Sequence, residues 1–489
     1  MPSSSKRKAI EPTTTTPPPT DHEDHPRKRL RSTSSKSPIQ TLPTELIEII
    51  LTFTSPAAVR TLRTTCKTLE LKSLQHFAAT QFTSTRAIVY EPSLTRLLSI
   101  ARSPNFAPHV QTLYIYCDYI YDLVTVALRP KNFPRAMKGL SKANISAYRR
   151  HVDAYNAFIA AGRHIELLTS ALSNLPKCST IHLCDSLSDA KQQHTYLARH
   201  EIEEQIGMPL ADTVPYQDPY LDTDPTDRLS WLLNLILSAS ASADLPLRKL
   251  SVEFWTRDAG LKIEALSLWR NPSLHPILAN LHTLRLHLDP PRFGDEAFLP
   301  KCTDLLRFFQ STWRVQELCL SFHSEDNDGD LTGWMEYFSC PDISYLPRLE
   351  KLHVRGVPYD YFLYGEPFLA FLGKFESTLQ ELELREIRLG EPRVWVGILR
   401  DLAGLGCEVS VEQGGRGERR RWEMLRRLGV RDVGGVDREL VRRLGEGEGE
   451  GGEEFTEKVV EFEGEGLGEW LRGVVGKLEV RSLGEKYLT

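Results

Sequence analysis

The chain has 489 residues, of which 41% are hydrophobic and 26% charged, and its formal net charge at pH 7 is −5. This near balance argues against a nucleic-acid partner, which needs a concentrated basic surface, and against a membrane-surface protein. No stretch approaches the ~20 apolar residues of a membrane span, and the Ser/Thr/Pro-rich start excludes a secretory signal. The eight cysteines include no C-x-x-C pair, which favours a reducing intracellular compartment, nuclear and/or cytoplasmic.

Residues 1–38 are of low complexity and contain almost no apolar residues, so we expect a disordered basic tail. Two basic clusters in this tail resemble a bipartite nuclear import signal, and a solvated basic tail is the alternative. The clusters consist of Lys6, Arg7, Lys8, Arg27, Lys28, Arg29 and Arg31.

Residues 39–80 predict two short amphipathic helices. In the first, Leu46, Ile49, Ile50 and Phe53 recur at the spacing of one helical face. A second helix is predicted to start at Ser55-Pro56, as an N-cap followed by a first-turn proline, and its apolar stripe is Val59, Leu62, Cys66 and Leu69. Two such helices cannot close a core by themselves, so they need a partner surface.

From about residue 108 a short L-x-x-L-x-L strand recurs after each helical stretch. The central apolar residues of the later strands are spaced by 34, 34, 34 and 30 residues, and the earlier gaps are about twice as long. Each unit combines one strand with one crossover helix, such as Leu305–Phe309 or Phe368–Leu372. The seven predicted strands are Val110–Ile115, Cys178–Leu183, Leu247–Val252, Leu281–Leu286, Val315–Leu320, Leu349–Val354 and Leu379–Leu384.

The pattern predicts an α/β chain in which an N-terminal helical module precedes an irregular repeat array with a parallel sheet and convex-side helices. The repeat domain is expected at 81–412, with insertions at 130–175 and 185–228; the first is read as helical and the second as a polar loop. Residues 413–489 form a Gly/Glu/Arg-rich region that we expect to be partly disordered, with an acidic loop at Gly445–Glu454 and a final strand at Leu478–Val480.

The segment Leu42–Leu69 resembles an F-box. The matching positions are Leu42, Pro43, Glu45, Leu46, Ile50, Leu51, Val59, Leu62, Arg63, Cys66 and Lys67. The resemblance implies docking onto the Skp adaptor of an SCF-type cullin–RING ubiquitin ligase. The residues expected to dock are Leu42, Pro43, Leu46, Ile49, Ile50, Phe53, Val59 and Leu62. The alternative is that these helices merely cap the repeat core.

The strands that follow resemble leucine-rich repeats. The asparagine or cysteine usual after the last strand leucine is missing, which predicts an irregular array. Outward-facing residues of mixed charge on the later strands suggest a protein target rather than a phosphate backbone, and a merely solvated face is the alternative. The candidate target-binding residues are Arg285, His287, Glu317, Lys351, His353, Arg355, Glu383 and Arg385.

No catalytic motif stands out, and we expect no enzyme activity, no cofactor and no metal. The segment Ser324–Gly329 superficially matches a calcium loop, but its first ligand is wrong and the bidentate glutamate is missing. The resulting hypothesis is a target-recognition adaptor of a ubiquitin ligase with an unknown protein target. The alternative is a repeat scaffold that assembles complexes without ubiquitin transfer.

Overall fold

The structure is a computed structural model, and part of the chain is described in it. The described residues are 37–117, 142–184, 196–206, 225–253, 260–289, 298–322, 337–338, 345–356, 362–363, 365–385, 388–389, 427–431 and 459–463. The basic clusters of the first 31 residues, the Gly445–Glu454 segment, the strand predicted at Leu478–Val480 and the Ser324–Gly329 segment lie outside them.

A helical module opens the described chain. It consists of α1 (Pro38–Thr41), α2 (Thr44–Thr52), α3 (Pro56–Thr65), α4 (Lys67–Lys72) and α5 (Leu74–Gln81). The predicted start of the second helix is confirmed, because the backbone N–H of Ala58 donates to Ser55 Oγ at 3.3 Å. That helix ends earlier than its apolar stripe suggests. Cys66 is extended, and the stripe from Val59 to Leu69 is therefore shared between α3 and α4.

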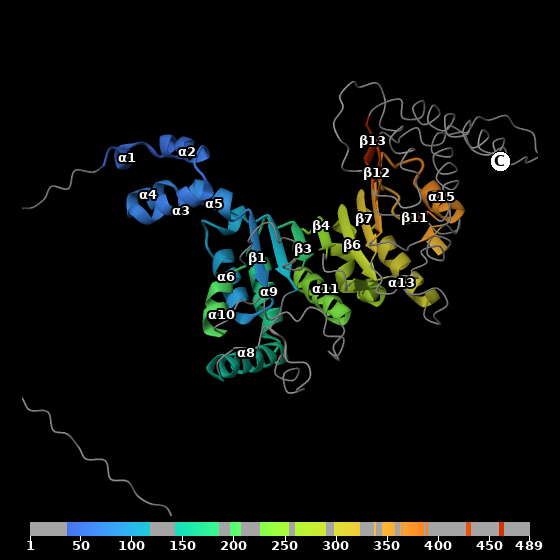
Figure 1. Ribbon diagram of the computed structural model, residues 1–489, viewed down its shortest axis with the longest axis horizontal. Helices are drawn as coiled ribbons and strands as arrows, with labels where there is room; N and C mark the ends of the chain where they lie inside the picture. Colours follow the sequence, from blue (N-terminus) through green and yellow to red (C-terminus); the bar gives the residue numbers. More distant parts are fainter. Residues whose placement is uncertain are drawn as a thin grey trace, which may run out of the picture.

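The rest of the fold is α/β and is built on an 11-stranded, mostly parallel sheet (Figure 1). Its strand order is β1-β2-β3-β4-β6-β7-β8-β10-β12-β13, with β5 (Leu261–Lys262) beside β6 and only β13 antiparallel to its neighbour. The strands are β1 (Ser84–Ile88), β2 (Thr112–Tyr116), β3 (Thr180–Cys184), β4 (Lys249–Glu253), β6 (Thr283–Asp289), β7 (Glu317–Phe322), β8 (Lys351–Gly356), β10 (Glu381–Arg385), β12 (Arg427–Arg431) and β13 (Val459–Glu463). A separate pair joins β9 (Phe362–Leu363) to β11 (Arg388–Leu389).

All seven predicted strands are present, as β2, β3, β4, β6, β7, β8 and β10. In the register of the sheet, the central apolar residues of the repeating units lie directly opposite one another. This buried row runs through Leu113, Ile181, Leu250, Leu284, Leu318, Leu352 and Leu382. The register is the same across gaps of different length, so the apolar strand pattern aligns the units and stacks them on a shared core.

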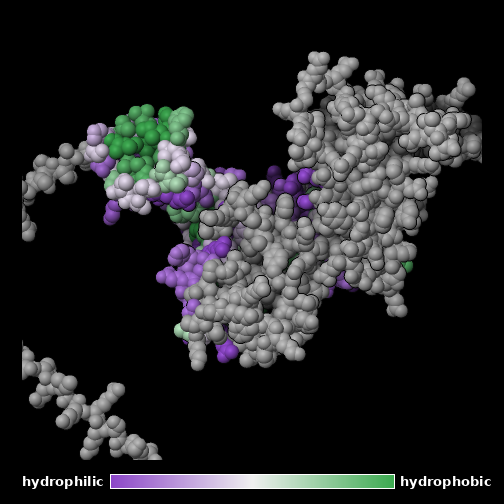
Figure 2. All heavy atoms as spheres, viewed as in Figure 1, coloured by the Kyte–Doolittle hydropathy of each residue, from purple (hydrophilic) through white to green (hydrophobic). Residues whose placement is uncertain are grey.

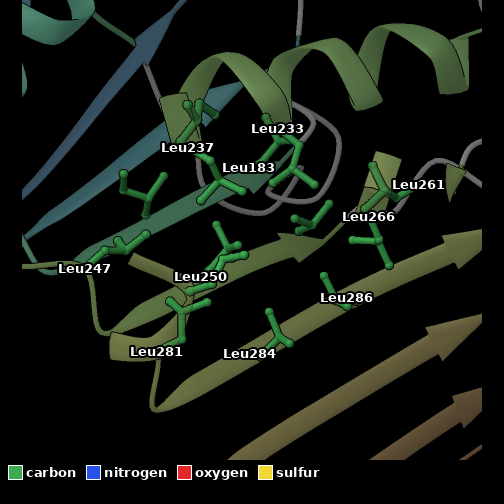
Figure 3. Packing of buried hydrophobic residues seen from close by; sticks show 14 of the residues in the cluster. Leu183, Leu233, Leu237, Leu247, Leu250, Leu261, Leu266, Leu281, Leu284 and Leu286 are labelled. Carbon is green, nitrogen blue, oxygen red and sulfur yellow. The ribbon is translucent and has the colours of Figure 1, made fainter. Parts of the chain in front are cut away.

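Helices cover one side of the sheet, where α9, α11 and α13 follow one another along the strands (Figure 1). Leu233 and Leu237 of α11 lie over Leu183 and Leu250 of the strands (Figure 3). The α-helices after the module are α6 (Glu91–Ala101), α8 (Lys142–Ala160), α9 (Arg163–Ser173), α10 (Arg199–Ile206), α11 (Pro225–Ser242), α12 (His275–Asn280), α13 (Phe298–Ser311) and α15 (Gly365–Gly373). The 3-10 turns are η1 (Ala107–His109), η5 (Ile263–Arg270) and η6 (Pro272–Leu274).

The first predicted insertion is helical where it is described, as expected, and contains α8 and α9, but α9 is not an addition to the array. Helix α9 packs between α6 and α11 and leads into β3, so it is a crossover helix of the array. The segment 185–228, expected to be a polar loop, contains α10 and the start of α11. The N–H of Leu197 donates to the carbonyl of Arg86 at 2.9 Å, so this segment reaches β1 and protects an edge that would otherwise be open to pairing.

Strand β1 was not predicted, and the sheet continues past residue 412 through β12 and β13. An unexpected hydrogen-bond ladder joins the successive units where their strands begin. Each carbonyl in the ladder accepts two backbone N–H groups from the next unit, at 2.7–3.2 Å. The accepting residues are Thr83, Gln111, Ser179, Arg248, His282, Gln316 and Glu350. This ladder links the units without the side-chain asparagines that the sequence lacks.

Candidate functional site

An exposed apolar patch lies on α2 and its C-terminal capping residue, Phe53. Its four side chains are the predicted stripe, and their exposed fractions are 46% for Leu46, 55% for Ile49, 43% for Ile50 and 87% for Phe53. We call these four residues the α2 patch. Figure 2 shows strongly hydrophobic surface gathered on the helical module. Scattered single apolar side chains are normal on a protein surface, but four on one helical face are not.

The opposite face of α2 explains why this patch remains uncovered. Ile47 and Leu51, each 1% exposed, face the core of the module, where they join Val59 and Leu69. Helix α2 is therefore apolar on two faces, and the core of the module can cover only one of them. The helical module does form a small core of its own, contrary to the expectation that two helices would need a partner for this, because α4 and α5 also pack on it.

Not every residue predicted to dock is available on the surface. Pro43 is exposed, but Leu42 and Leu62 are half-buried against the module core. Val59 is only 1% exposed, so its predicted role as a docking residue is wrong. Its apolar neighbours on the same stripe of α3 and α4 bury it within the module, where it packs against Ile47 and Leu51 of α2.

Two cations hold the helices of the module together. The Nζ of Lys72 donates to the carbonyls of Gln40 and Leu42, which ties α4 to the segment before α2. The guanidinium of Arg63 donates to the carbonyl of Glu70 at 3.0 Å, and its carbon lies 4.0 Å from the centroid of the Phe77 ring. These contacts fix α2 relative to α3, α4 and α5.

Aromatic contacts connect the helical module to the sheet. The rings of Phe77 and Phe82 meet edge to face with centroids 5.7 Å apart, and Phe82 stacks on Phe106 at 4.4 Å. Phe82 also packs against the main core. Because these rings are in continuous contact from α5 to the turn before β2, the α2 patch has a defined position relative to the sheet.

The side of the sheet away from the helices carries the predicted target-binding residues, and we call it the open face. Most of its charges pair with one another across neighbouring strands. Arg285 lies 3.3 Å from Glu253 and 2.9 Å from Glu317. Lys351 meets Glu381 at 2.8 Å. Glu383 contacts both His353 and Arg385 at 2.6 Å.

The electrostatics of the open face agree with this pairing. Burial disfavours the charged form of Glu317, but the hydrogen bond and charge of Arg285 outweigh it and lower the pKa of this carboxyl. Burial likewise opposes ionisation of Glu383, and the hydrogen bonds from His353 and Arg385 still lower its pKa. These carboxylates are therefore stabilised in their charged form by partners within the chain, which reduces what they can offer to another protein.

His287 departs from the prediction of an outward, accessible residue. It is 3% exposed, and its Nδ1 lies 2.8 Å from Ser321 Oγ. Arg355 is only partly exposed, whereas Lys351 is exposed but paired with Glu381. The structure thus brings the predicted residues together on neighbouring strands, but as a network that largely satisfies itself.

The first three strands carry an arrangement that the sequence analysis missed. The Tyr114 ring lies parallel to His182, with centroids 4.5 Å apart and planes 8° apart, and the guanidinium carbon of Arg86 is 5.2 Å from the Tyr114 centroid. In register, these residues share one row with Ser251, Arg285, Cys319, His353 and Glu383. Arg285 directly follows the central apolar residue of its strand, and reading the same position in every predicted strand would have found Tyr114 and His182. Arg86 could not be found in this way, because β1 was not predicted.

Within the described ranges, no cluster of three or more His, Cys, Asp or Glu side chains is arranged to hold a metal ion. No helix among the same residues is long and apolar enough to cross a membrane. Comparison with family models and with curated proteins returns no match to this chain.

Proposed function

We propose that this chain is the target-recognition adaptor of an SCF-type cullin–RING ubiquitin ligase. In this proposal the helical module is an F-box, the α2 patch binds the Skp adaptor, and the parallel sheet with its helices is a leucine-rich-repeat-like array that binds a target protein. The chemistry takes place on other subunits. This chain contributes proximity, which raises the concentration of the target near the ubiquitin-charged enzyme.

The observation that carries the proposal is the exposure of Leu46, Ile49, Ile50 and Phe53 together on one face of a helix whose other face is already buried. This arrangement favours docking over the alternative in which the helices merely cap the array, since a capping role would bury the stripe against the sheet. The F-box pattern of the sequence coincides with the exposed face at Leu46 and Ile50, which is the second line of support.

The apolar surface that the α2 patch can bury limits how tightly it can bind a partner by itself. The four side chains are already partly covered, so burying their remaining surface is worth roughly 4–7 kcal/mol, at about 1.5–3 kcal/mol for a whole side chain. Association costs at least ~4 kcal/mol. The α2 patch alone is therefore insufficient for tight binding, and contacts around it are needed. Pro43 and Leu42, which directly precede α2, and Leu62 on α3 can supply them.

The experiment is co-purification of the Skp adaptor with the full chain and with the double variant Leu46→Asp/Ile50→Asp. Two carboxylates in a dry interface would leave buried charges, so we expect binding to fall by at least about 100-fold. The matched control is Leu299→Asp, which changes a leucine that is 62% exposed on α13 and should leave binding unchanged. Equal binding by the double variant, with normal thermal unfolding, would contradict the assignment.

A scaffold without ubiquitin transfer is the remaining alternative, and a second measurement addresses it. The purified complex of this chain with the Skp adaptor, cullin and RING subunits is supplied with ubiquitin-charged enzyme and a captured target. Ubiquitin on the target that depends on the α2 patch is the expected result. A stable complex that never transfers ubiquitin to a bound target would favour the scaffold. The basic clusters at Lys6–Lys8 and Arg27–Arg31 remain proposed as a nuclear import signal.

A further inference from the structure

The open face of the sheet changes character along its length. From β6 to β10 several outward cations face carboxylates, as in Arg285 between Glu253 and Glu317 and Lys351 beside Glu381. On β1, β2 and β3 the first two outward positions contain no carboxylate at all. They are Ser84, Arg86, Thr112, Tyr114, Thr180 and His182. We call these six residues, together with Lys249 beside Thr180 on β4, the β1–β3 surface.

Two cations of this surface, Arg86 and Lys249, form no ion pair among the described residues. The charge of Lys249 acts on Glu317 only from beyond ion-pair distance, and the Nε of Arg86 is buried without a hydrogen-bond acceptor. The guanidinium of Arg86 is instead held against Tyr114, which in turn stacks on His182. A stacked guanidinium loses little side-chain freedom when it binds an anion, because its orientation is already restricted.

We propose that the β1–β3 surface binds an acidic peptide segment of the target protein, with one carboxylate on Arg86 and a second on Lys249. This inference rests on the proposed function for the identity of the partner as a ligase target. It moves the target contact away from the residues predicted on β6 to β10, whose charges are already paired, and towards the strands nearest the helical module (Figure 1).

Charge complementarity and distance both favour a peptide carrying separate carboxylates. Arg86 lies on β1 and Lys249 on β4, and three strand spacings of ~4.8 Å separate these strands by about 14 Å. Two separate carboxylates match this separation of the strands better than one anionic group. An extended peptide advances ~3.3 Å per residue, so acidic side chains about four positions apart would match. The hydroxyls of Ser84, Thr112 and Thr180 add hydrogen-bonding groups along the row that contains Lys249.

The test uses the full chain and fluorescence anisotropy with labelled twelve-residue Ser/Gly peptides. One peptide carries two glutamates four positions apart, a second carries glutamines in their place, and a third carries phosphoserines there. We expect the glutamate peptide to bind at least about tenfold more tightly than the glutamine peptide, and Arg86→Gln or Lys249→Gln to weaken it about fivefold each. The control Lys351→Gln, which removes a cation already paired with Glu381, should change it less than about twofold.

Several outcomes would overturn the proposal. These are equal binding of the glutamate and glutamine peptides, an equal loss in Lys351→Gln, or binding of the phosphoserine peptide alone. A fourth is peptide binding that appears only after Glu446→Gln/Glu448→Gln/Glu450→Gln, because the occupant would then be a segment of this chain. Arg86→Lys keeps the charge and should retain most of the affinity, which separates lost charge from lost folding. Skp-adaptor co-purification is measured on the same samples, so failure of the proposed function is distinguished from failure of this surface.

Discussion

The guanidinium of Arg63 lies over the ring of Phe77, 4.0 Å from its centroid, and joins α3 to α5 beneath the helix that carries the exposed patch. The same guanidinium donates to the carbonyl of Glu70 and to Ser73 Oγ. One side chain thus satisfies polar groups at the end of α4 and covers an aromatic ring. The exposed face of α2 depends on this framework for its position.

We predict that Arg63→Ala destabilises the helical module by about 1–3 kcal/mol, since both the cation–π contact and the hydrogen bonds are lost. Amide hydrogen exchange in residues 44–72 measures the effect, with faster exchange expected there and unchanged exchange in the sheet. Arg63→Lys retains the charge above the ring and should lose less. If the alanine variant exchanges at the rate of the parent, the Arg63–Phe77 contact contributes nothing to the module.

Buried and exposed apolar residues of the module should behave in opposite ways. Val59→Ala should cost about 1–2 kcal/mol of folding stability, because it leaves a cavity in the small core. Ile49→Ala should change stability by less than about 0.5 kcal/mol, since the side chain is largely exposed.

For binding to the Skp adaptor the order should reverse, with about tenfold weaker binding for Ile49→Ala and little change for Val59→Ala. Chemical unfolding and titration with the purified adaptor measure the two properties. A result in which both variants lose stability and binding in proportion would mean that α2 acts only through the fold.

The stacked histidine of the open face predicts a pH dependence of stability. Burial lowers the pKa of His182 to about 4; Glu253 opposes this shift, and Lys249 and Arg285 add to it. The unfolded chain holds a proton on this histidine below pH ~6.5, so between pH ~6.5 and ~4 it binds more protons than the folded chain. The contribution of neutral His182 to folding stability is therefore complete above pH ~6.5 and is lost as the pH falls from ~6.5 to ~4.

Allowing for solvent screening, the loss should amount to about 2 kcal/mol. Urea unfolding near pH 7 and near pH 4 should show this fall, and His182→Gln should reduce it. His200→Gln, which changes a histidine whose side chain is 93% exposed, is the matched control. An identical pH dependence in His182→Gln and the parent would assign the effect to other groups.

Gly260 marks a close approach between backbones beside β6. An added Cβ would lie 2.6 Å from the amide nitrogen of Asp289 and 2.7 Å from the carbonyl carbon of Leu288, and neither backbone atom can move without disturbing the strand. We expect Gly260→Ala to cost about 1–3 kcal/mol. Gly373→Ala, where a Cβ meets nothing within 4 Å, should stay within about 0.5 kcal/mol. Thermal unfolding of the two variants compares their stabilities. Equal melting temperatures would show that β6 can shift to accommodate the added methyl group.

The sequence alone was sufficient to locate seven strands of the sheet. A strand that places apolar residues on alternate positions buries one face, and a spacing of 34 residues returns the next strand at the same register, as Leu284 opposite Leu318 shows. Strand β1 escaped prediction because Ser84–Ile88 lacks the leucine pattern, and only its pairing with β2 makes it part of the sheet.

The tertiary structure alone decided which apolar side chains remain available and which charges remain unpaired. Helical spacing places Leu46 and Ile50 on one face of α2 and Val59 on the apolar face of α3. It cannot say which of these faces is buried within the chain. Only the packing of α2, α3 and α4 buries Val59 and leaves Ile49 exposed. Similarly, Arg285 and Arg86 both face outward, and their difference depends on neighbours far away in sequence. Glu317 is 32 residues from Arg285 and neutralises it, whereas no described carboxylate meets Arg86.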